Sequence, residues 1–145
     1  FQSYALFPNM IVEENVAYGL RVRKVPFDER SQRVRESLEM MHISDLAKRR
    51  IDQLSGGQRQ LVNLTRVFLR RPRIWLMDEP TAAMDRQLAD HVTHAFKQAL
   101  RPQDTLVLVT HKPEMLTLVD RLVVIAKHEV LLDGPKEQVI RQLHA

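Results

Sequence analysis

A change in the spacing of apolar residues near Pro72 constrains the fold of this chain more than any other sequence feature. Before this point, Leu61, Leu64 and Phe68 recur at the spacing of one helix face. After it, residues 74–77 form a continuous apolar run that ends in two acidic residues, a pattern typical of a buried strand followed by a polar turn. The pattern therefore predicts a helical first part and a second part that contains strands.

Further helices and strands follow from the same rules, with Asp28 and Ser55 as expected helix N-caps. We expect helices over residues 13–20, 28–41, 45–49, 55–70, 86–100, 113–118 and 136–143, and strands over 74–77, 105–109, 121–125 and 130–132. Strands that alternate with helices predict crossover connections and a mostly parallel sheet, while the turn at residues 127–128 predicts a final hairpin. The expected fold class is α/β, with an α-helical subdomain in the first part.

Composition excludes several classes of protein. The chain has 145 residues, 44% of them hydrophobic, which suits one domain or a large piece of one. It has no cysteine, which excludes disulfides, Cys-based zinc sites and thiol catalysis. Its apolar runs are too short to span a bilayer. A net charge of +4 is too small to indicate nucleic-acid binding by itself.

The segment Leu54-Ser55-Gly56-Gly57-Gln58 stands where the long helix begins. Two glycines let the backbone approach an anion closely, and the first N–H groups of a helix point toward it. The Ser55 hydroxyl can add a further donor. Taken alone, the segment also fits a plain capped helix after a Gly-Gly turn. It therefore indicates a phosphate site only in combination with other motifs.

Two predicted strands end in residues that suit phosphate chemistry. Asp78 offers the oxygen ligands that Mg²⁺ prefers, and the adjacent Glu79 can polarise a water for attack on a phosphoryl group. His111, after the strand at 105–109, can donate to a transferring phosphate. A solvated acidic turn and a surface histidine are the plain alternatives. The acidic pair stands where α/β sheets bind ligands, at the carboxyl end of a strand, but a solvated acidic turn is common there, so the pair alone does not decide between the two. For His111 taken alone, the plain interpretation is preferred.

The order of these motifs, LSGGQ, then an apolar strand with Asp-Glu, then an apolar strand with Thr-His, resembles the nucleotide-binding domain of ATP-binding cassette (ABC) proteins. The resemblance implies a partial core of the P-loop NTPase fold, of the ABC type. It implies that Ser55, Gly56, Gly57 and Gln58 form the signature motif, which closes over the γ-phosphate of ATP held by a partner domain. It further implies that Glu79 is the general base or positions the attacking water.

The same resemblance assigns roles to residues outside these segments. Asp78 would be the Walker B aspartate that holds Mg²⁺, and His111 the switch histidine. Asp85 would lie in the D-loop at the dimer contact, where Ala82 replaces the usual serine. Gln2 matches the Q-loop glutamine, which senses Mg²⁺ and the attacking water. The chain would thus comprise a Q-loop segment (1–12), a helical subdomain with the signature motif (13–72) and the C-terminal part of the ATPase core (73–145).

The resemblance also implies a function for the parent protein. It would be an ATPase that binds ATP and Mg²⁺, dimerises with a second nucleotide-binding domain and powers solute transport through transmembrane permease subunits. It would sit on the cytoplasmic face of a bacterial membrane, docked partly through residues 7–20 and the helix from Asp28. An ABC-type ATPase of DNA repair or translation, and a non-catalytic docking module, are the alternatives. Nucleic acid is not expected as a partner, because the sequence has neither long heptads nor a dense Lys/Arg stripe.

The direction of transport stays open at this stage. The first 20 residues look most like ATPases of bacterial importers for small solutes. Residues 105–143 look more like ATPases of bacterial systems that secrete proteins.

A G-x-x-x-x-G-K-[S/T] phosphate loop does not occur in the sequence, in which Gly19 and Gly134 are isolated. In the family this loop precedes the Q-loop glutamine, so we expect a fragment; a naturally degenerate subunit is the alternative. We expect the isolated chain to bind Mg-ATP weakly and not to hydrolyse it. We also expect the strand at 74–77 to expose one apolar face, because the central strand beside it would be missing.

Overall fold

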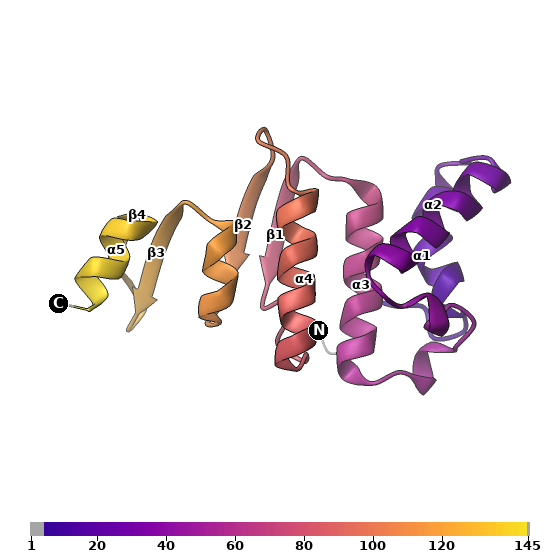
Figure 1. Ribbon diagram of the computed structural model, residues 1–145, viewed down its shortest axis with the longest axis horizontal. Helices are drawn as coiled ribbons and strands as arrows, with labels where there is room; N and C mark the ends of the chain where they lie inside the picture. The colour runs from indigo at the N-terminus through magenta and orange to yellow at the C-terminus, as the bar shows by residue number, and fades with distance from the viewer. Residues whose placement is uncertain (1–4, 145) are drawn as a thin grey trace. The chain divides into compact units, whose positions relative to one another are not determined.

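A computed structural model describes residues 5–144, which form two compact units that divide between Val109 and Thr110 (Figure 1). The first unit contains α1 (Val12–Val22), α2 (Phe27–Met40), the 3₁₀ turns η1 (Ser44–Leu46) and η2 (Ile51–Gln53), α3 (Gly56–Arg70), β1 (Ile74–Asp78), α4 (Arg86–Ala99) and β2 (Thr105–Val109). The second unit contains the 3₁₀ turn η3 (Pro113–Leu118), β3 (Arg121–Ala126), β4 (Glu129–Pro135) and α5 (Lys136–Leu143).

Helix α3 is the central helix of the first unit. Leu61, Leu64 and Phe68 are all buried on it, as their helical spacing predicts. Helices α1 and α2 both pack against α3 (Figure 1). These three helices form the helical subdomain. A short link at residues 71–73 connects α3 to β1.

Asn15 of α1 fixes the segment that precedes this helix. Its side chain is fully buried, and Nδ2 donates to the carbonyls of Phe7 (3.1 Å), Met10 (3.3 Å) and Ile11 (3.2 Å). Oδ1 accepts a bond of 2.8 Å from the Phe7 N–H. A buried amide with its donors and acceptor all paired specifies a single local path for the chain. The residues just before α1 are therefore held against the helical subdomain.

Strands β1 and β2 form a parallel pair that is connected through α4. Three aromatic rings join this pair to the helices: Phe68 of α3, Trp75 of β1 and Phe96 of α4. The ring centroids are 5.4 Å apart for Phe68 and Trp75, 4.8 Å for Phe68 and Phe96, and 5.9 Å for Trp75 and Phe96. Edge-on and tilted contacts at these distances are the favoured geometry for aromatic pairs. The cluster therefore anchors β1 to both flanking helices.

Only one face of β1 is covered in the described part of the chain. Trp75 and Met77 are 2% and 7% exposed, whereas Ile74 and Leu76 on the opposite face are 71% and 76% exposed. The prediction of an exposed apolar face on this strand is confirmed. The simpler expectation of a strand buried on both sides is wrong for these residues, because α3 and α4 cover one side of the pair alone.

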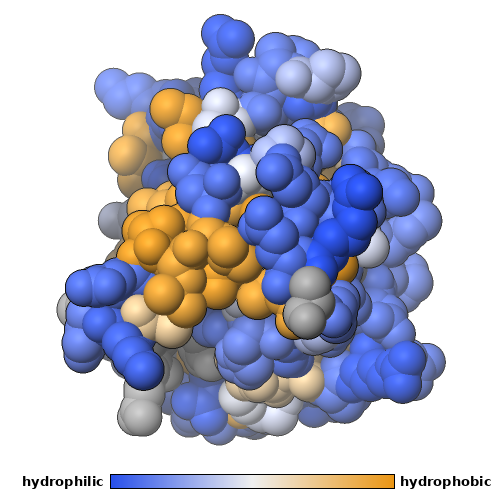
Figure 2. Space-filling model, turned by 90° about the vertical axis from the view of Figure 1, so that its left-hand side faces the viewer, coloured by the Kyte–Doolittle hydropathy of each residue, from blue (hydrophilic) through white to orange (hydrophobic). Residues whose placement is uncertain are grey.

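The second unit is an antiparallel hairpin of β3 and β4 followed by α5. Arg121 and Asp133 face each other across the two strands, with Nε–Oδ1 2.9 Å and Nη2–Oδ2 3.0 Å. Figure 2 shows apolar side chains gathered on one face of the molecule. The exposed apolar residues of the hairpin are Val123, Ile125, Val130 and Leu131. The hairpin thus carries an uncovered apolar surface of its own.

Most predicted elements are confirmed within one to three residues, but Asp28 is not a helix N-cap. Helix α2 begins at Phe27 with Pro26 as N-cap and no side-chain cap bond, so Asp28 lies in the first turn. The segments at 45–49 and 113–118 contain 3₁₀ rather than α-helical turns. The described strands form one parallel and one antiparallel pair. Among residues 5–144, no helix is both long and apolar enough to cross a membrane.

Candidate functional site

The predicted signature segment forms a capped and exposed helix start. Ser55 is the N-cap of α3: its Oγ accepts from the Gln58 N–H at 3.1 Å, while Gln58 Oε1 accepts from the Ser55 N–H at 2.9 Å. This reciprocal pair is a capping box. The Ser55 hydroxyl still has its own O–H to donate. Ser55 and Gly56 are exposed, so the donors at this helix start are accessible to a ligand.

Gly57 packs the helix start against the loop that follows β1. A Cβ placed on Gly57 would lie 2.7 Å from the Ala83 carbonyl oxygen, closer than real Cβ contacts. At Gly56 the nearest contact would be ordinary, 3.9 Å from the Ala83 Cβ. Both glycines have negative φ, so Gly57 is required for close approach rather than for an unusual backbone conformation. The signature segment and the predicted D-loop are therefore in direct contact.

The acidic pair lies at the carboxyl end of β1, as predicted. Asp78 is the last residue of the strand and is exposed. Glu79 follows it with φ of 45°, in the left-handed region that costs a residue with a side chain about 1–3 kcal/mol. Its N–H donates to the Val109 carbonyl at 2.9 Å, which ties it to the end of β2. Its carbonyl accepts from the Ala82 N–H at 3.1 Å.

Gln60 connects the signature helix to this acidic turn, and the sequence analysis did not identify it. The residue is 7% exposed. Its Nε2 donates to the Glu79 carbonyl at 3.0 Å, and its Oε1 accepts from the Ala83 N–H at 3.1 Å. One signal was available: Gln60 continues the i, i+4 series of Leu64 and Phe68, so it falls on the buried face of α3.

Asp85 has a local role that the sequence analysis did not assign. It is the N-cap of α4, and its Oδ1 accepts from the Leu88 N–H at 2.9 Å. The Asp85 side chain therefore fixes the end of the predicted D-loop onto the helix that follows. A dimer contact for Asp85 stays a prediction.

Two further predicted site residues, His111 and Gln2, lie outside the described residues of the first unit. His111 follows β2 and is an exposed residue of the second unit, in which the Lys112 N–H donates to Thr110 Oγ1 at 3.1 Å. Gln2 lies outside the described residues. The roles predicted for both stay predictions.

A magnesium ion at the end of β1 would need ligands beyond the described side chains. Among residues 5–144, no group of three His, Asp or Glu side chains could hold a metal ion by itself. Mg²⁺ in nucleotide sites is normally bound by one or two carboxylates, with phosphate oxygens and waters completing the octahedron. The exposed carboxylate of Asp78 fits that pattern, because it offers a single anionic ligand to a metal that arrives with phosphate.

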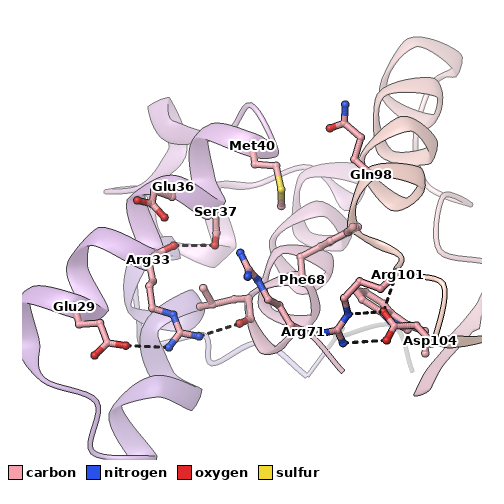
Figure 3. A pocket seen from close by; sticks show the side chains of 13 residues that line it. Glu29, Arg33, Glu36, Ser37, Met40, Phe68, Arg71, Gln98, Arg101 and Asp104 are labelled. Carbon is pink, nitrogen blue, oxygen red and sulfur yellow. Dashed lines mark hydrogen bonds and ion pairs between the residues drawn. The ribbon is translucent and has the colours of Figure 1, made fainter. Parts of the chain in front are cut away.

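A cavity of about 650 Å³ in the same unit lies away from these motifs. Figure 3 shows Arg33 between the Glu29 carboxylate and a backbone carbonyl, and Arg101 paired with Asp104. Bonds from Arg101 lower the pKa of the Asp104 carboxyl. The predicted site residues do not line this cavity, and four of its charged side chains form two internal pairs, Glu29 with Arg33 and Arg101 with Asp104.

Comparison with known families agrees with the motif order. The sequence model of a family described as "ABC transporter" matches residues 1–82. That span includes the signature helix, the acidic turn and the start of the loop that packs against Gly57. The match therefore covers more than half of the chain, including Ser55, Gly57, Gln60 and Glu79, and ends one residue before Ala83.

Curated relatives match along nearly the whole chain. The spermidine/putrescine import ATP-binding protein PotA of Mannheimia succiniciproducens is 40% identical over 144 residues, 98% of this chain and 39% of that protein. The putrescine transport ATP-binding protein PotG of Escherichia coli is 42% identical over 141 residues, 96% of this chain and 37% of that protein. The chain thus spans about two-fifths of the length of these relatives.

Solved structures agree in fold. The dimeric ATP-binding cassette MJ0796, in a post-hydrolysis state bound to ADP and Pi, superposes with a TM-score of 0.81 and 29% identity over 93% of this chain and 60% of that one. A second dimeric structure of MJ0796, described as a bacterial ABC transporter cassette, gives the same TM-score of 0.81. The expected fold class, a partial α/β core of the ABC type with a helical subdomain, is confirmed. Motifs, family match and fold together show that this chain belongs to the ABC transporter family.

Proposed function

We propose that this chain is the signature-bearing part of an ATP-hydrolysing subunit that powers transport of a small solute. One observation carries the proposal: the exposed start of α3, the Ala83 loop and the Glu79 turn form a single contact group. A ligand-facing helix start is thereby attached to the residue predicted to act on water. A family match over residues 1–82 and relatives named as ATP-binding proteins support the same function.

Each residue of this group would have its own role in ATP hydrolysis. The Ser55 hydroxyl and the first N–H groups of α3 would donate to the γ-phosphate of ATP held by a second nucleotide-binding domain. Asp78 would hold Mg²⁺, which supplies charge neutralisation on the phosphates when bound. Glu79 would orient the attacking water and accept its proton. His111 would donate to the transferring phosphate, and Gln2 would sense Mg²⁺ and the attacking water.

The chain's partners would be a second cassette and the permease. Dimeric cassettes among the similar structures support the first. For the second, a groove of about 780 Å³ lies between α1, α2 and η1, on the surface that the sequence analysis assigned to permease docking. Phe27 at its edge is 70% exposed. An exposed aromatic beside an open groove is typical of a protein contact, and docking there would place the subunit at the cytoplasmic membrane face.

The alternatives are less well supported. The relatives described above are transport proteins by name, which favours transport over DNA repair or translation. PotA is named for import, which agrees with the resemblance of the first 20 residues, and PotG is named for putrescine transport. Polyamines are therefore the first substrates to test. The Arg-rich end of α3 is partly used within the fold: Arg66 donates to the Ala5 carbonyl at 2.8 Å and lies 5.6 Å from the Phe7 ring centroid.

Two variants at Ser55 test the proposal in the whole protein. Asp and Asn both cap helices about as well as Ser, so each keeps the fold of α3. Ser55→Asp places a negative charge against the γ-phosphate and should abolish ATP hydrolysis, whereas the neutral Ser55→Asn should retain much more of it. The measurement is steady-state ATPase rate together with thermal unfolding of each variant. Equal rates in the two variants would overturn the assignment of this helix start to a phosphate.

A further inference from the structure

The geometry points to Gln60 as a positioning residue for Glu79, a role that rests on the proposed function. We infer that the Gln60 amide fastens the signature helix to the backbone of the catalytic carboxylate residue. The position of the helix start, which would follow the nucleotide, then sets the position of the Glu79 side chain. The motifs that carry the proposed function do not include Gln60.

The orientation of the Gln60 amide follows from its partners. The Glu79 carbonyl can only accept a hydrogen bond, so Nε2 faces it at 3.0 Å. The Ala83 N–H can only donate, so Oε1 faces it at 3.1 Å. A side chain that both donates and accepts is required at this position. Among side chains of similar shape, Glu loses the donor while it is ionised, and Leu or Met loses both functions.

The backbone at Glu79 needs such a clamp. Its φ of 45° is a conformation that residues with a side chain seldom adopt, and it persists where the surroundings fix it. The Glu79 N–H is bonded to Val109, and its carbonyl receives two donors, from Ala82 and from Gln60. The bond from Gln60 comes from the helical subdomain. Loss of that bond would remove a direct attachment of the Glu79 backbone to α3.

The same end of α3 also touches the loop at a second point. The Gly57 backbone packs on the Ala83 carbonyl so closely that it has no room for a Cβ. Ala83 thus contacts Gly57 through its carbonyl and Gln60 through its N–H. Two contacts, one turn apart on the helix, make α3 and the acidic turn move as one body. A shift of the start of α3 would therefore shift the backbone of Glu79 with it.

The test compares Gln60→Glu and Gln60→Leu with the wild-type whole protein. Displacement of a reacting group by about 1 Å costs on the order of 10²-fold in rate, so kcat for ATP hydrolysis should fall by about that factor in both variants. ATP binding, and KM for ATP, should stay close to wild type, because the Gln60 amide bonds to Glu79 and Ala83 rather than to the Ser55 hydroxyl. The matched control is Thr65→Val, which removes a buried hydroxyl whose bond, to the Leu61 carbonyl, stays within α3.

The pH profile separates positioning from loss of packing. In Gln60→Glu the introduced carboxyl is buried against a carbonyl, which raises its pKa, and once protonated it can again donate to the Glu79 carbonyl. The rate of this variant relative to wild type should therefore rise as the pH is lowered. The corresponding ratio for Gln60→Leu should stay flat. A flat ratio for both variants would contradict the inference.

A double-variant cycle completes the test. In a Glu79→Gln background the position of residue 79 no longer matters for catalysis, so Gln60→Leu should cause no further loss of the residual rate. The same fold loss in both backgrounds, or a wild-type kcat in the single variants, would overturn the role of Gln60 while leaving the proposed function intact. A whole protein whose ATPase rate is insensitive to Glu79→Gln would instead overturn both.

Discussion

Gly57 and Ala83 approach so closely that a methyl group on Gly57 would lie 2.7 Å from the Ala83 carbonyl oxygen. The obstructing atom is backbone, so it cannot rotate away as a side chain does. The contact joins the start of α3 to the loop after β1. Because a larger side chain at residue 57 would force the two segments apart, the free energy of unfolding of variants at this position tests how close they lie. The adjacent Gly56 offers a matched comparison, because its Cβ would meet nothing closer than 3.9 Å.

Replacing Gly57 by Ala should therefore destabilise the fold, whereas replacing Gly56 by Ala should not. Overpacking a close contact costs typically about 1–3 kcal/mol. A Gly-to-Ala change at an unobstructed helical position is neutral or stabilising by up to about 1 kcal/mol. Urea unfolding of the two variants measures the difference directly. Equal free energies of unfolding for both would show that the contact is looser than the structure indicates.

Removing the cap at Asp85 should weaken α4. Asp85→Ala deletes the acceptor of the Leu88 N–H and should lower the free energy of unfolding by about 1 kcal/mol. Asp85→Asn keeps an acceptor and should retain most of that stability. Asp90→Ala, at an exposed position within the same helix, controls for the loss of charge. A loss in Asp85→Asn as large as in Asp85→Ala would contradict a capping role.

The stability of the first unit should depend on pH through His91. This ring stacks on His42 with centroids 4.0 Å apart, and its Nε2 is buried without a hydrogen-bond partner in the described residues. Burial, then the charge of His42, lowers the pKa of His91, with His94 adding to the effect and a bond to the Met40 carbonyl opposing it.

The sign of the pH effect follows from that shift. The unfolded chain takes up the His91 proton below about pH 6.5, while the folded chain resists it. The free energy of unfolding should therefore fall as the pH drops below about 6.5, and His91→Phe, which keeps a stacking ring, should make this fall shallower. Urea unfolding at a series of pH values between about 5 and 8 measures the free energy of unfolding. His144→Phe, which replaces an exposed histidine, is the control for the loss of a histidine. A fall of the same steepness in His91→Phe would contradict the assignment.

The isolated chain should bind Mg-ATP only weakly and should not hydrolyse it. The sequence contains no loop whose backbone and lysine could grip the β- and γ-phosphates. The donors at the start of α3 and the Asp78 carboxylate would contact only the phosphate end of ATP. Calorimetric titration of the purified chain with Mg-ATP checks this, and micromolar affinity would refute it.

Local signals explain what was predictable from the sequence. Ser55 and Gln58 lie three residues apart, so the capping box depends only on nearby residues and was recognisable as a helix start. The same rule gave a wrong N-cap at Asp28. Pro26, with ψ of 147°, is the last extended residue, so the helix begins at Phe27 and Asp28 lies in its first turn. Element types were thus predictable more reliably than their ends.

Long-range contacts explain what was not predictable. The partners of Gln60 lie 19 and 23 residues away, and the His42–His91 stack joins the turn after α2 to α4. Such pairs are set by how the helices and the loop after β1 pack, which periodicity does not specify. The left-handed backbone at Glu79 is likewise imposed by its bonds to Val109 and Gln60 rather than by any preference of glutamate.

The ATPase rate of the whole protein carrying Glu79→Gln tests the central claim most directly. The amide keeps the size of the side chain but cannot accept the proton of the attacking water. We expect the rate to fall by about 10²-fold or more while ATP binding is retained, and we expect the control Glu36→Gln, on the exposed surface of α2, to behave as wild type. An unchanged rate in Glu79→Gln would contradict the account, because the acidic turn would then have no part in hydrolysis.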